Sequence, residues 1–298
     1  MKFSVIIPSY NEGDDIRLSI ESAINQNEKD KEILVVDDST DNTKNIIKEY
    51  KSVGVKLIDG KKQGCCGARN LGIKIATGDI VVLLNADVIL PYDFLNKISK
   101  HYENGADYVL VESEVFNRKS VWARFIEMQH RFEYKHRNDI EWTEGFSCKR
   151  EVALSVGGIP GEFSITFCRD WLLGVNLNKA GFKKIVDKSI LVTHKAPETF
   201  SEYWRVRKAR GRFGALNQYY IFHRAKPNLF LKFIVKDIFF VLKFLTIIPA
   251  FYRVYKISKL SDRSLRDFFP FYVAYFIQEL ARAMGEWQGW KIAKKVSL

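Results

Sequence analysis

The sequence predicts an α/β fold: a mixed, mostly parallel β-sheet covered by helices on both faces, followed by a helical C-terminal region that associates with membranes. Short apolar runs alternate with helical patterns over residues 1–90, which is typical of parallel sheets. Several of these runs end directly in polar residues. Residues 201–298 carry 19 Lys/Arg and 6 Asp/Glu, whereas the first 200 residues carry 28 and 29. The last third therefore accounts for the whole excess behind the net charge of +12.

The composition is that of a globular protein. Of 298 residues, 47% are hydrophobic and 28% are charged, which supplies a sizeable core and excludes a disordered, collagen-like or disulfide-stapled chain. The four cysteines (Cys65, Cys66, Cys148 and Cys168) show neither a C-x-x-C pair nor zinc-ligand spacing, so we expect reduced thiols in a cytosolic setting. The first residues contain no apolar stretch of the length of a signal peptide.

Apolar, β-rich runs predict the strands of the sheet, and helical spacing between them predicts the covering helices. In chain order, we expect strands at residues 2–8, 31–36, 55–58 and 80–84, and helices at residues 14–26, 43–50 and 68–76. Ligands of parallel sheets bind beyond the carboxyl ends of the strands. The residues expected at that edge are 9–12, 37–39 and 85–87.

Beyond residue 91 the alternation becomes less regular. We expect a helix over residues 92–103, a strand over 108–112, a helical region over 120–138 and a helix over 171–180. Three helical runs follow: residues 201–224; residues 228–248, ended or kinked by Pro249; and residues 268–277, interrupted by Pro270. The chain thus divides into residues 1–90, 91–200 and 201–298.

Two acidic motifs lie at the expected edge of the sheet. Asp37 and Asp38 end an apolar strand, where carboxylates accept hydrogen bonds from a nucleotide base and ribose hydroxyls; a solvated turn with a helix cap has the same pattern. Asp87, in Asn85-Ala86-Asp87, follows another apolar strand, where a divalent cation bridges a carboxylate to a diphosphate. Tripeptides of this kind are common, so neither motif is decisive alone.

Three further features are weak when taken singly. Residues 64–69 (GCCGAR) open a helix, whose N-terminus favours anions, and Arg69 adds a bidentate donor; an ordinary turn before a helix has the same pattern. Asp170 precedes a helix and is typical of an N-cap. His194 follows an apolar strand, where most histidines are structural rather than metal ligands.

In their chain order, these motifs resemble those of the family 2 inverting glycosyltransferases. The resemblance covers residues 1–200 and rests on VIIPSYNE, VVDDSTD, GARNLGI, GDIVVLLNADVILP, GGIPGEF, CRDWLLGVNLNKAGFK and the strand that ends at His194. It implies a GT-A fold, with a nucleotide-sugar-binding half over residues 1–90 and an acceptor-binding half over residues 91–200.

The resemblance also implies roles for the matching residues. Asp170 matches the catalytic base, and Asp87 matches the last position of the D-x-D motif that binds Mg²⁺ or Mn²⁺. His194 falls where some members carry a histidine that approaches the metal or the diphosphate. The residues implied at the nucleotide are Pro8, Tyr10, Glu12, Asp38, Arg69 and Ala86.

The sequence departs from the family pattern at two positions. Asn85 replaces the usual first Asp of the metal motif, which leaves one firm carboxylate ligand there. Arg169 replaces the Glu before the base, and its positive charge favours an ionised Asp170 or pairs with a phosphate. Arg169 and Trp171 are therefore candidate contacts for the acceptor or a phosphate.

The implied reaction is a single displacement with inversion at the anomeric carbon of the sugar. Asp170 takes the proton of the acceptor hydroxyl, and a nucleoside diphosphate leaves from the opposite face. A metal ion on Asp87, with His194 beside it, stabilises the charge of the leaving group.

The basic tail indicates where the acceptor lies. Residues 228–248 place Lys232, Lys236 and Lys243 within about 40° of one another on a helical wheel, and the rest of the wheel is Phe, Ile, Leu and Val. We expect this helix to lie in the headgroup region of a membrane, with one or two spanning helices or packing against a partner as alternatives. The expected location is the cytoplasmic side of a membrane, peripheral or monotopic.

A second basic group supports a phosphorylated lipid as the acceptor. Arg205, Lys208 and Arg212 share one face of the predicted helix over residues 201–224, where they suit a lipid phosphate or diphosphate, although a solvated basic helix has the same pattern. Several family members act on polyisoprenyl phosphates or lipid-linked glycans, so the expected acceptor is one of these.

Three other classes of function are alternatives for this sequence. A nucleic-acid-binding protein is not expected, because the basic tail carries bulky aliphatic runs rather than stacking aromatics spaced along strands. A dinucleotide-dependent dehydrogenase needs G-x-G-x-x-G in its first turn, and this turn reads PSYNEG. A catalytically silent relative that scaffolds a membrane complex stays open, because of Asn85 and Arg169.

Overall fold

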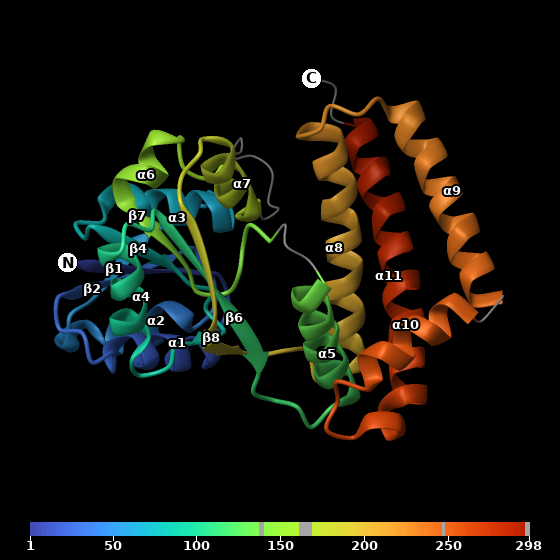
Figure 1. The fold of residues 1–298 in the computed structure, drawn as a ribbon. Helices are drawn as coiled ribbons and strands as arrows, with labels where there is room; N and C mark the ends of the chain where they lie inside the picture. The colour runs from blue at the N-terminus through green and yellow to red at the C-terminus, as the bar shows by residue number, and fades with distance from the viewer. Residues whose placement is uncertain (137–139, 161–168, 246–247, 296–298) are drawn as a thin grey trace. The chain divides into compact units, whose positions relative to one another are not determined.

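The computed structural model describes residues 1–136, 140–160, 169–245 and 248–295, and the chain forms two compact units (Figure 1). The first unit comprises Met1–Glu114 and Asp139–Lys195, and the second comprises Val115–Asn138 and Ala196–Leu298. This division differs from the one at residue 200 expected from the sequence, because the segment from Val115 packs with the C-terminal helices. Its Ala123 and Phe125 side chains share a buried core with Phe271.

The first unit is built on a mixed sheet whose described strands run in the order β3-β2-β1-β4-β7-β6-β8-β5. The strands are β1 (Phe3–Ser9), β2 (Lys31–Asp37), β3 (Val55–Asp59), β4 (Ile80–Leu83), β5 (Val88–Ile89), β6 (Tyr108–Val115), β7 (Phe146–Lys149) and β8 (Lys184–His194).

The first four strands of the chain pair in parallel. β1 pairs in parallel with β2 and β4, and β2 pairs in parallel with β3. β7 instead pairs antiparallel with both β4 and β6, and β8 pairs antiparallel with β5. The prediction of a mixed, mostly parallel sheet therefore holds for the first four strands, and the antiparallel pairs are those of β7 and β5. Parallel strands need a crossover that packs on the sheet, whereas the chain between β6 and β7 enters the second unit.

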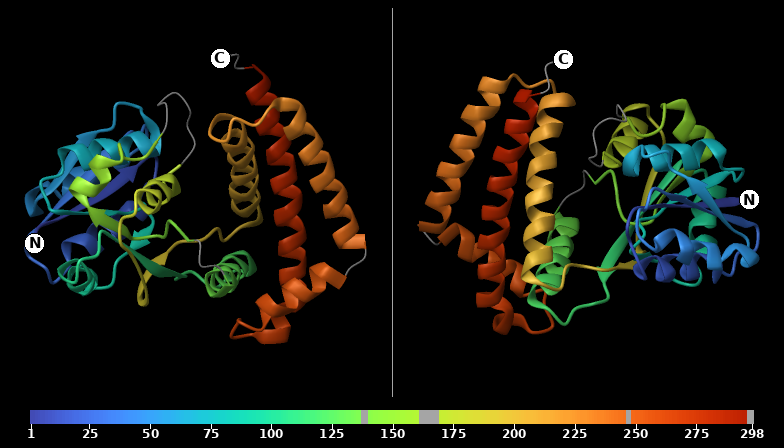
Figure 2. Two further views of the ribbon diagram at one scale, coloured as in Figure 1. Left: turned by 45° about the horizontal axis from the view of Figure 1, so that its top comes forward. Right: turned by 180° about the vertical axis from the view of Figure 1, so that it is seen from behind.

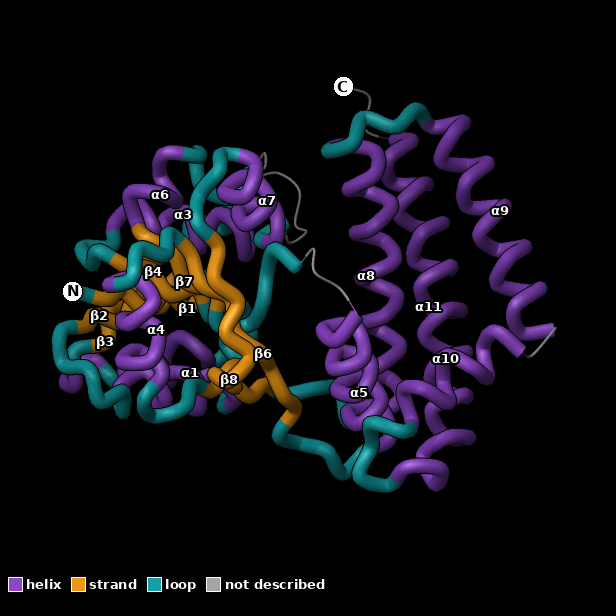
Figure 3. Tube along the Cα trace, viewed as in Figure 1, coloured by secondary structure: helices purple, strands orange, loops and turns teal. Residues whose placement is uncertain are grey.

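Helices cover both faces of the sheet, so the strands form a middle layer (Figure 3). α1 (Asp15–Ile24), α2 (Thr43–Glu49) and α4 (Phe94–Glu103) share a buried core with one face, and a short 3-10 turn, η1 (Lys51–Val53), follows α2. α3 (Gly64–Ile75), α6 (Arg150–Ser155) and α7 (Trp171–Lys179) pack on the other face. Alternate residues of β1 face opposite sides of the sheet. Val5 and Ile7 lie in the core shared with α1, α2 and α4, and Ile6 lies in the core shared with α3, α6 and α7.

The second unit is helical. Its elements are α5 (Val121–His136), α8 (Phe200–Tyr220), α9 (Lys226–Leu245), α10 (Ile248–Ser258), η2 (Ser264–Asp267) and α11 (Phe268–Lys295), with α11 lying between α8 and α9 (Figure 2). α8 begins at a capping box, in which the Thr199 side chain accepts from the backbone of Glu202 and Glu202 accepts from the backbone of Thr199.

α8 and α11 approach closely through glycines. A Cβ atom at Gly285 would lie 2.0 Å from the backbone oxygen of Lys208, and one at Gly211 would lie 2.1 Å from that of Arg282. The two backbones are therefore too close for any side chain at either position. This contact fixes the core of the second unit.

The tail differs from its sequence prediction in two respects. Pro249 and Pro270 lie in the first turns of α10 and α11, where proline is tolerated, so Pro270 does not interrupt its helix. The lysines of α9 were expected to face lipid headgroups, but Lys236 and Lys243 pair with α11 carboxylates. No described helix combines the length and apolar character required to cross a membrane.

The described cysteines, Cys65, Cys66 and Cys148, form no disulfide, and Cys168 lies outside the described residues.

Candidate active site

The carboxyl ends of β1 and β2 bring two of the predicted motifs together. The strands are in register up to their last residues, with Ser9 opposite Asp37. Beyond them, the backbone N–H of Asn11 donates to Ser39 Oγ (2.8 Å), and the Asn11 side chain accepts from the backbone N–H of Thr40 (2.8 Å). Asn11 has a left-handed φ of 56°, which asparagine tolerates better than most residues. The loops that carry Tyr10 to Glu12 and Asp37 to Asp41 therefore lie side by side.

The two adjacent carboxylates of β2 have different environments. Asp37 is buried and accepts from Ser39 Oγ (2.5 Å), while its Oδ2 has no hydrogen-bond partner among the described residues. Asp38 is half-buried and accepts from the backbone N–H of Lys62 (2.7 Å). A Cβ atom at Gly60 would lie 2.6 Å from Asp38 Oδ1, so only glycine allows this loop so close to the carboxylate. Asp38 is thus the more accessible of the pair for a nucleotide.

Asp87 and His194 are brought together by strand pairing. Val88 lies opposite His194 in the β5–β8 ladder, and the backbone N–H of Lys195 donates to the carbonyl of Asp87 (3.2 Å). The Ser19 hydroxyl of α1 holds the same loop, since its one hydrogen can bond the carbonyl of Ala86 (2.7 Å) or that of Val88 (2.6 Å). The loop after β4 is therefore fixed from two sides.

The carboxyl groups around Asp87 repel one another. Burial raises the pKa of Asp87, and the neighbouring His194 opposes that rise. Burial, with the charge of Asp87 as the next cause, raises the pKa of Glu12 to about 7. Lys195 lies at the same place, where its Nζ pairs with Asp15 (2.8 Å). The local field therefore favours an added cation.

The donor set fits a divalent cation that is completed by a substrate. Among the described residues, no group of three or more His, Cys, Asp or Glu side chains is arranged to hold a metal ion. Asp87 and His194 nevertheless lie on paired segments and interact electrostatically, and Glu12 interacts with Asp87. Mg²⁺ is commonly held by one or two carboxylates together with substrate phosphates. The fit is therefore to a metal ion that binds with a diphosphate.

Arg69 links the metal motif to the predicted base. Its side chain is fully buried, and its guanidinium donates to Cys65 Sγ and to Asn85 Oδ1, and lies 3.5 Å from Asp170 Oδ2. The guanidinium also lies over the Trp142 ring, 5.5 Å from its centroid. A fully buried guanidinium has no surface open to a nucleotide in this structure, so the contact expected from the sequence stays a prediction.

Asp170 lies at the N-terminus of α7, as the sequence predicts for an N-cap. Its carboxylate accepts from the backbone N–H of Trp171 (3.0 Å), and its side chain is 17% exposed. Because Arg69 contacts both Asp170 and Asn85, the predicted base lies at the edge of the sheet that carries Asp87. Arg169 is buried, with its backbone N–H donating to Cys66 Sγ (3.0 Å). Residues 161–168, including GEF of the GGIPGEF motif, lie outside the described residues.

The structure adds Glu144, which the sequence analysis did not single out. The Asn85 amide donates to Glu144 Oε2 (2.6 Å), while its oxygen accepts from Arg69. An aspartate at position 85 would place a second carboxylate against Glu144. Asn85 thus bridges a cation and an anion, which gives a structural reason for its departure from D-x-D. In the sequence, the acidic residue in WTEG, just before β7, is the feature that could have indicated Glu144 as a site residue.

The basic residues predicted on α8 belong to the second unit. Arg205 is exposed, whereas Lys208 and Arg212 are half-buried. Arg207, which no sequence motif singles out, is 5% exposed, and its guanidinium lies 5.1 Å from the centroid of the Tyr203 ring. Burial lowers the pKa of Arg207 to about 10. The role of Arg205, Lys208 and Arg212 at an acceptor phosphate stays a prediction.

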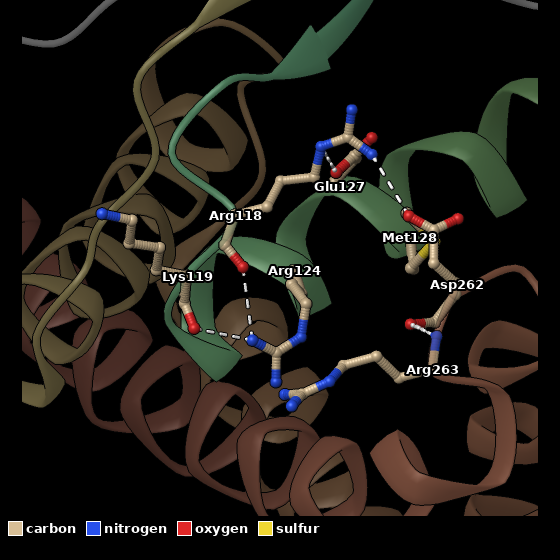
Figure 4. A pocket seen from close by; sticks show the side chains of 8 residues that line it. Arg118, Lys119, Arg124, Glu127, Met128, Asp262 and Arg263 are labelled. Atoms are coloured by element: carbon tan, nitrogen blue, oxygen red, sulfur yellow. Dashed lines mark hydrogen bonds and ion pairs between the residues drawn. The ribbon is translucent and has the colours of Figure 1, made fainter.

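A separate basic pocket in the second unit contains none of the predicted site residues. It has a volume of about 360 Å³ and is lined by Arg118, Lys119, Arg124 and Arg263 together with acidic residues (Figure 4). Arg118 pairs with Glu127 (3.3 Å), and Arg124 pairs with Asp267 (2.9 Å). Protein groups therefore already neutralise much of its charge.

Comparison with known proteins gives a family for most of the first unit. The family model described as "Glycosyl transferase family 2" matches residues 4–156. The chain is 33% identical over 129 residues to the Escherichia coli UDP-Glc:alpha-D-GlcNAc-diphosphoundecaprenol beta-1,3-glucosyltransferase WfgD, over 42% of this chain and 51% of that protein. It is 34% identical over 116 residues to the Staphylococcus aureus poly(ribitol-phosphate) beta-N-acetylglucosaminyltransferase TarP, over 37% of this chain and 36% of that protein. The matches thus span about half or less of these relatives.

Solved structures show the fold. The mannosyltransferase PcManGT from Pyrobaculum calidifontis, in complex with GDP-Man and Mn²⁺, matches 100% of this chain and 76% of its own, with a TM-score of 0.58 at 18% identity. S. aureus TarS 1-349, in complex with UDP, matches 97% of this chain and 91% of its own, with a TM-score of 0.54 at 17% identity. At these identities, the likeness concerns the fold alone.

Proposed function

Because the chain belongs to glycosyl transferase family 2, we propose that it transfers a hexosyl or N-acetylhexosaminyl group from a nucleotide-sugar donor to an acceptor, with inversion at the anomeric carbon. Asp170 is the base in this proposal, and Asp87 with His194 would hold Mg²⁺ or Mn²⁺. The observation that carries it is the position of Arg69, which contacts both Asp170 and Asn85. A base and a metal-binding carboxylate thereby lie at the same edge of the sheet.

The proposed chemistry uses groups of this chain at each step. The Asp170 carboxylate takes the proton of an acceptor hydroxyl, a role that contributes about 10²–10⁴ in rate. The hydroxyl oxygen bonds to the anomeric carbon, and the bond from that carbon to the diphosphate breaks on the opposite face. Where the acceptor is a lipid phosphate, it attacks as an anion and needs no base. A bound metal ion would neutralise charge on the leaving nucleoside diphosphate.

The donor is proposed to lie along the loops after β1, β2 and β4. Asp38 would accept from the base, and Pro8, Tyr10, Glu12 and Ala86 would border the nucleotide. Support comes from the hydrogen bonds that hold the β1 and β2 loops together and from the accessible carboxylate of Asp38. TarS and PcManGT are described in complexes with UDP and with GDP-Man.

For the acceptor, we favour a polyisoprenyl phosphate or a lipid-linked glycan. WfgD is named for a diphosphoundecaprenol-linked acceptor, and TarP for poly(ribitol phosphate). Phosphate is common to both and suits the basic side chains of α8. Arg205, Lys208 and Arg212, together with Arg169 and Trp171, are the proposed contacts. The proposed location is peripheral, on the cytoplasmic side of a membrane.

The experiment is a thermal-shift screen of UDP-, GDP- and dTDP-sugars with and without Mn²⁺. A ligand that binds only the native state raises its stability in proportion to ln(1 + [L]/Kd), so the true donor should raise Tm, and more so with Mn²⁺. The donor found is then tested for transfer to GlcNAc-diphosphoundecaprenol and to poly(ribitol phosphate). Donor binding without hydrolysis or transfer to either acceptor would favour the silent scaffold, and no shift with any sugar nucleotide would contradict the proposed site.

A further inference from the structure

The outward face of α9 is apolar along its whole length. Five side chains share it: Leu231 (63% exposed), Val235 (41%), Ile238 (53%), Phe239 (66%) and Leu242 (48%). Their spacing of i, i+4, i+7, i+8 and i+11 places them on one side of the helix. We call these five residues the α9 face. A helix on the surface of a soluble unit normally presents polar side chains there.

The charged side chains of α9 are turned toward the rest of the second unit. Lys232 donates to Gln218 of α8 (3.0 Å), Lys236 pairs with Glu286 of α11, and Lys243 pairs with Glu279 of α11 (3.3 Å). The Asp237 carboxylate also accepts from α11, from Trp287 Nε1 (2.7 Å). α9 thus buries Leu229 and Phe233 and pairs its charged side chains with the rest of the unit, while its exposed side is apolar.

A shallow groove of about 350 Å³ adjoins the α9 face. It is lined by Ile234, Asp237, Ile238, Val241 and Leu242, of which Ile238 and Leu242 belong to the face. Its one acidic residue is already bonded to Trp287. The groove therefore offers an apolar surface, which suits an acyl chain or another hydrophobic group better than a polar ligand.

Charge selects the partner of this face. The second unit carries 25 Lys/Arg and 9 Asp/Glu over its two segments, so its net charge is +16. Two copies of such a unit repel each other, whereas anionic lipid phosphates attract it. Lys256 of α10 and Lys259, which directly follows α10, lie over the rings of Tyr252 (4.4 Å) and Tyr255 (4.6 Å), an amphipathic pairing suited to the region between headgroups and acyl chains.

We propose that the α9 face inserts into the surface of an anionic lipid bilayer, with the helix lying along the surface and its lysines retained by α11. The partner is the bilayer itself. This goes beyond the proposed glycosyl transfer and does not depend on the acceptor being a lipid. Membrane binding and transfer activity can therefore fail separately.

The first test is vesicle flotation of the full chain. Wild type should float with vesicles of phosphatidylcholine and phosphatidylglycerol and bind less to phosphatidylcholine alone. The test variant replaces three residues of the α9 face, and the control replaces three exposed apolar residues of the first unit: L231E/I238E/F239E against L18E/V53E/Y92E. The test variant should lose about tenfold or more in binding, and the control should bind like wild type. All of these positions are exposed, and circular dichroism checks the folding of each variant.

A conservative pair of variants tests insertion without added charge. Phe239→Trp places a reporter on the α9 face, and Tyr92→Trp places one on the first unit. Lipids with brominated acyl chains should quench the added fluorescence of Phe239→Trp and not that of Tyr92→Trp. The proposal would be overturned if both tryptophans are quenched equally or if the Glu variant floats like wild type. It would also be overturned if wild type does not bind anionic vesicles. A further result would also overturn it: light scattering shows that wild type is a dimer, the Glu variant is a monomer, and wild type does not bind vesicles.

Discussion

Replacing Arg69 by methionine should destabilise the first unit far more than the same change at Arg17. Arg69 is fully buried and contacts Asn85, Cys65 and Asp170, with the Asp170 carboxylate 3.5 Å away. Arg17 has the better ion-pair geometry, with two bonds to Glu49 of 2.6 and 3.0 Å, but its side chain is 34% exposed. Burial, rather than geometry, should therefore decide the cost.

The magnitudes follow from burial. Removing one partner of a buried pair costs about 3–5 kcal/mol, and the partial exposure of Asp170 favours the lower end, about 3 kcal/mol. The Arg17–Glu49 pair is exposed and screened by solvent, so its loss should cost much less. For a unit of this size, about 3 kcal/mol lowers Tm by about 6–12 °C.

Differential scanning calorimetry of the two variants measures the difference directly. The transition of the first unit should fall much further for Arg69→Met than for Arg17→Met. Arg69→Lys should lose less stability than Arg69→Met, because it retains the charge. It should lower kcat and change KM little, because Asp170 is then held less firmly in position. An equal or larger loss for Arg17→Met would refute the assignment of Arg69 as the buried link between the base and the metal motif.

Two further predictions concern the acidic cluster and the helical unit. Because folding raises the pKa of Glu12 from 4.5 to about 7, its ionisation costs no stability below pH 4.5 and costs the full amount above pH 7. Glu12→Gln should therefore stabilise the metal-free protein by about 3 kcal/mol at pH 8 and leave its urea midpoint unchanged at pH 4. A gain at both pH values would contradict this cause. Gly285→Ala should cost the second unit about 3 kcal/mol, because its Cβ would lie 2.0 Å from the Lys208 oxygen. Gly214→Ala meets open space and, in the same calorimetric scan, should be neutral or stabilising by up to about 1 kcal/mol. Similar losses for both variants would contradict the close approach of α8 and α11.

The sequence predicted the N-terminal half of the sheet well because each strand there is a local, continuous apolar run. Residues 3–9 and 31–37 need only their own composition to be recognised as buried strands. β7 could not be placed in this way. Its four residues lie between β4 and β6, and that pairing depends on contacts distant in the sequence.

The candidate site shows the same limit. Motif order indicated Asp87, His194 and Asp170, and strand register explains how Asp87 and His194 meet. Arg69 looked like a nucleotide contact because it lies near a helix N-terminus. Its burial between Asn85 and Asp170 depends on three separate segments, so local patterns do not reveal it.

For α9, the helical wheel gave the correct grouping of the lysines but not the side they face. A wheel separates charged from apolar residues and does not say which side meets the rest of the protein. Glu279 and Glu286, some forty residues further along the chain, decide that orientation. Glu279 and Glu286 are seven residues apart on α11, as are Lys236 and Lys243 on α9, and this matching spacing could have indicated the pairing.

The most direct test of the proposed chemistry compares Asp170→Asn with wild type in two assays on the same preparations. Asp93→Asn is the matched control, since Asp93 is an exposed carboxylate at the start of another helix of the first unit. With a hydroxyl acceptor, sugar transfer should fall by about 10²-fold or more for Asp170→Asn and stay unchanged for Asp93→Asn, while the nucleotide-sugar binds all three proteins alike in calorimetry. Turnover of Asp170→Asn close to wild type would contradict the assignment of Asp170 as the base.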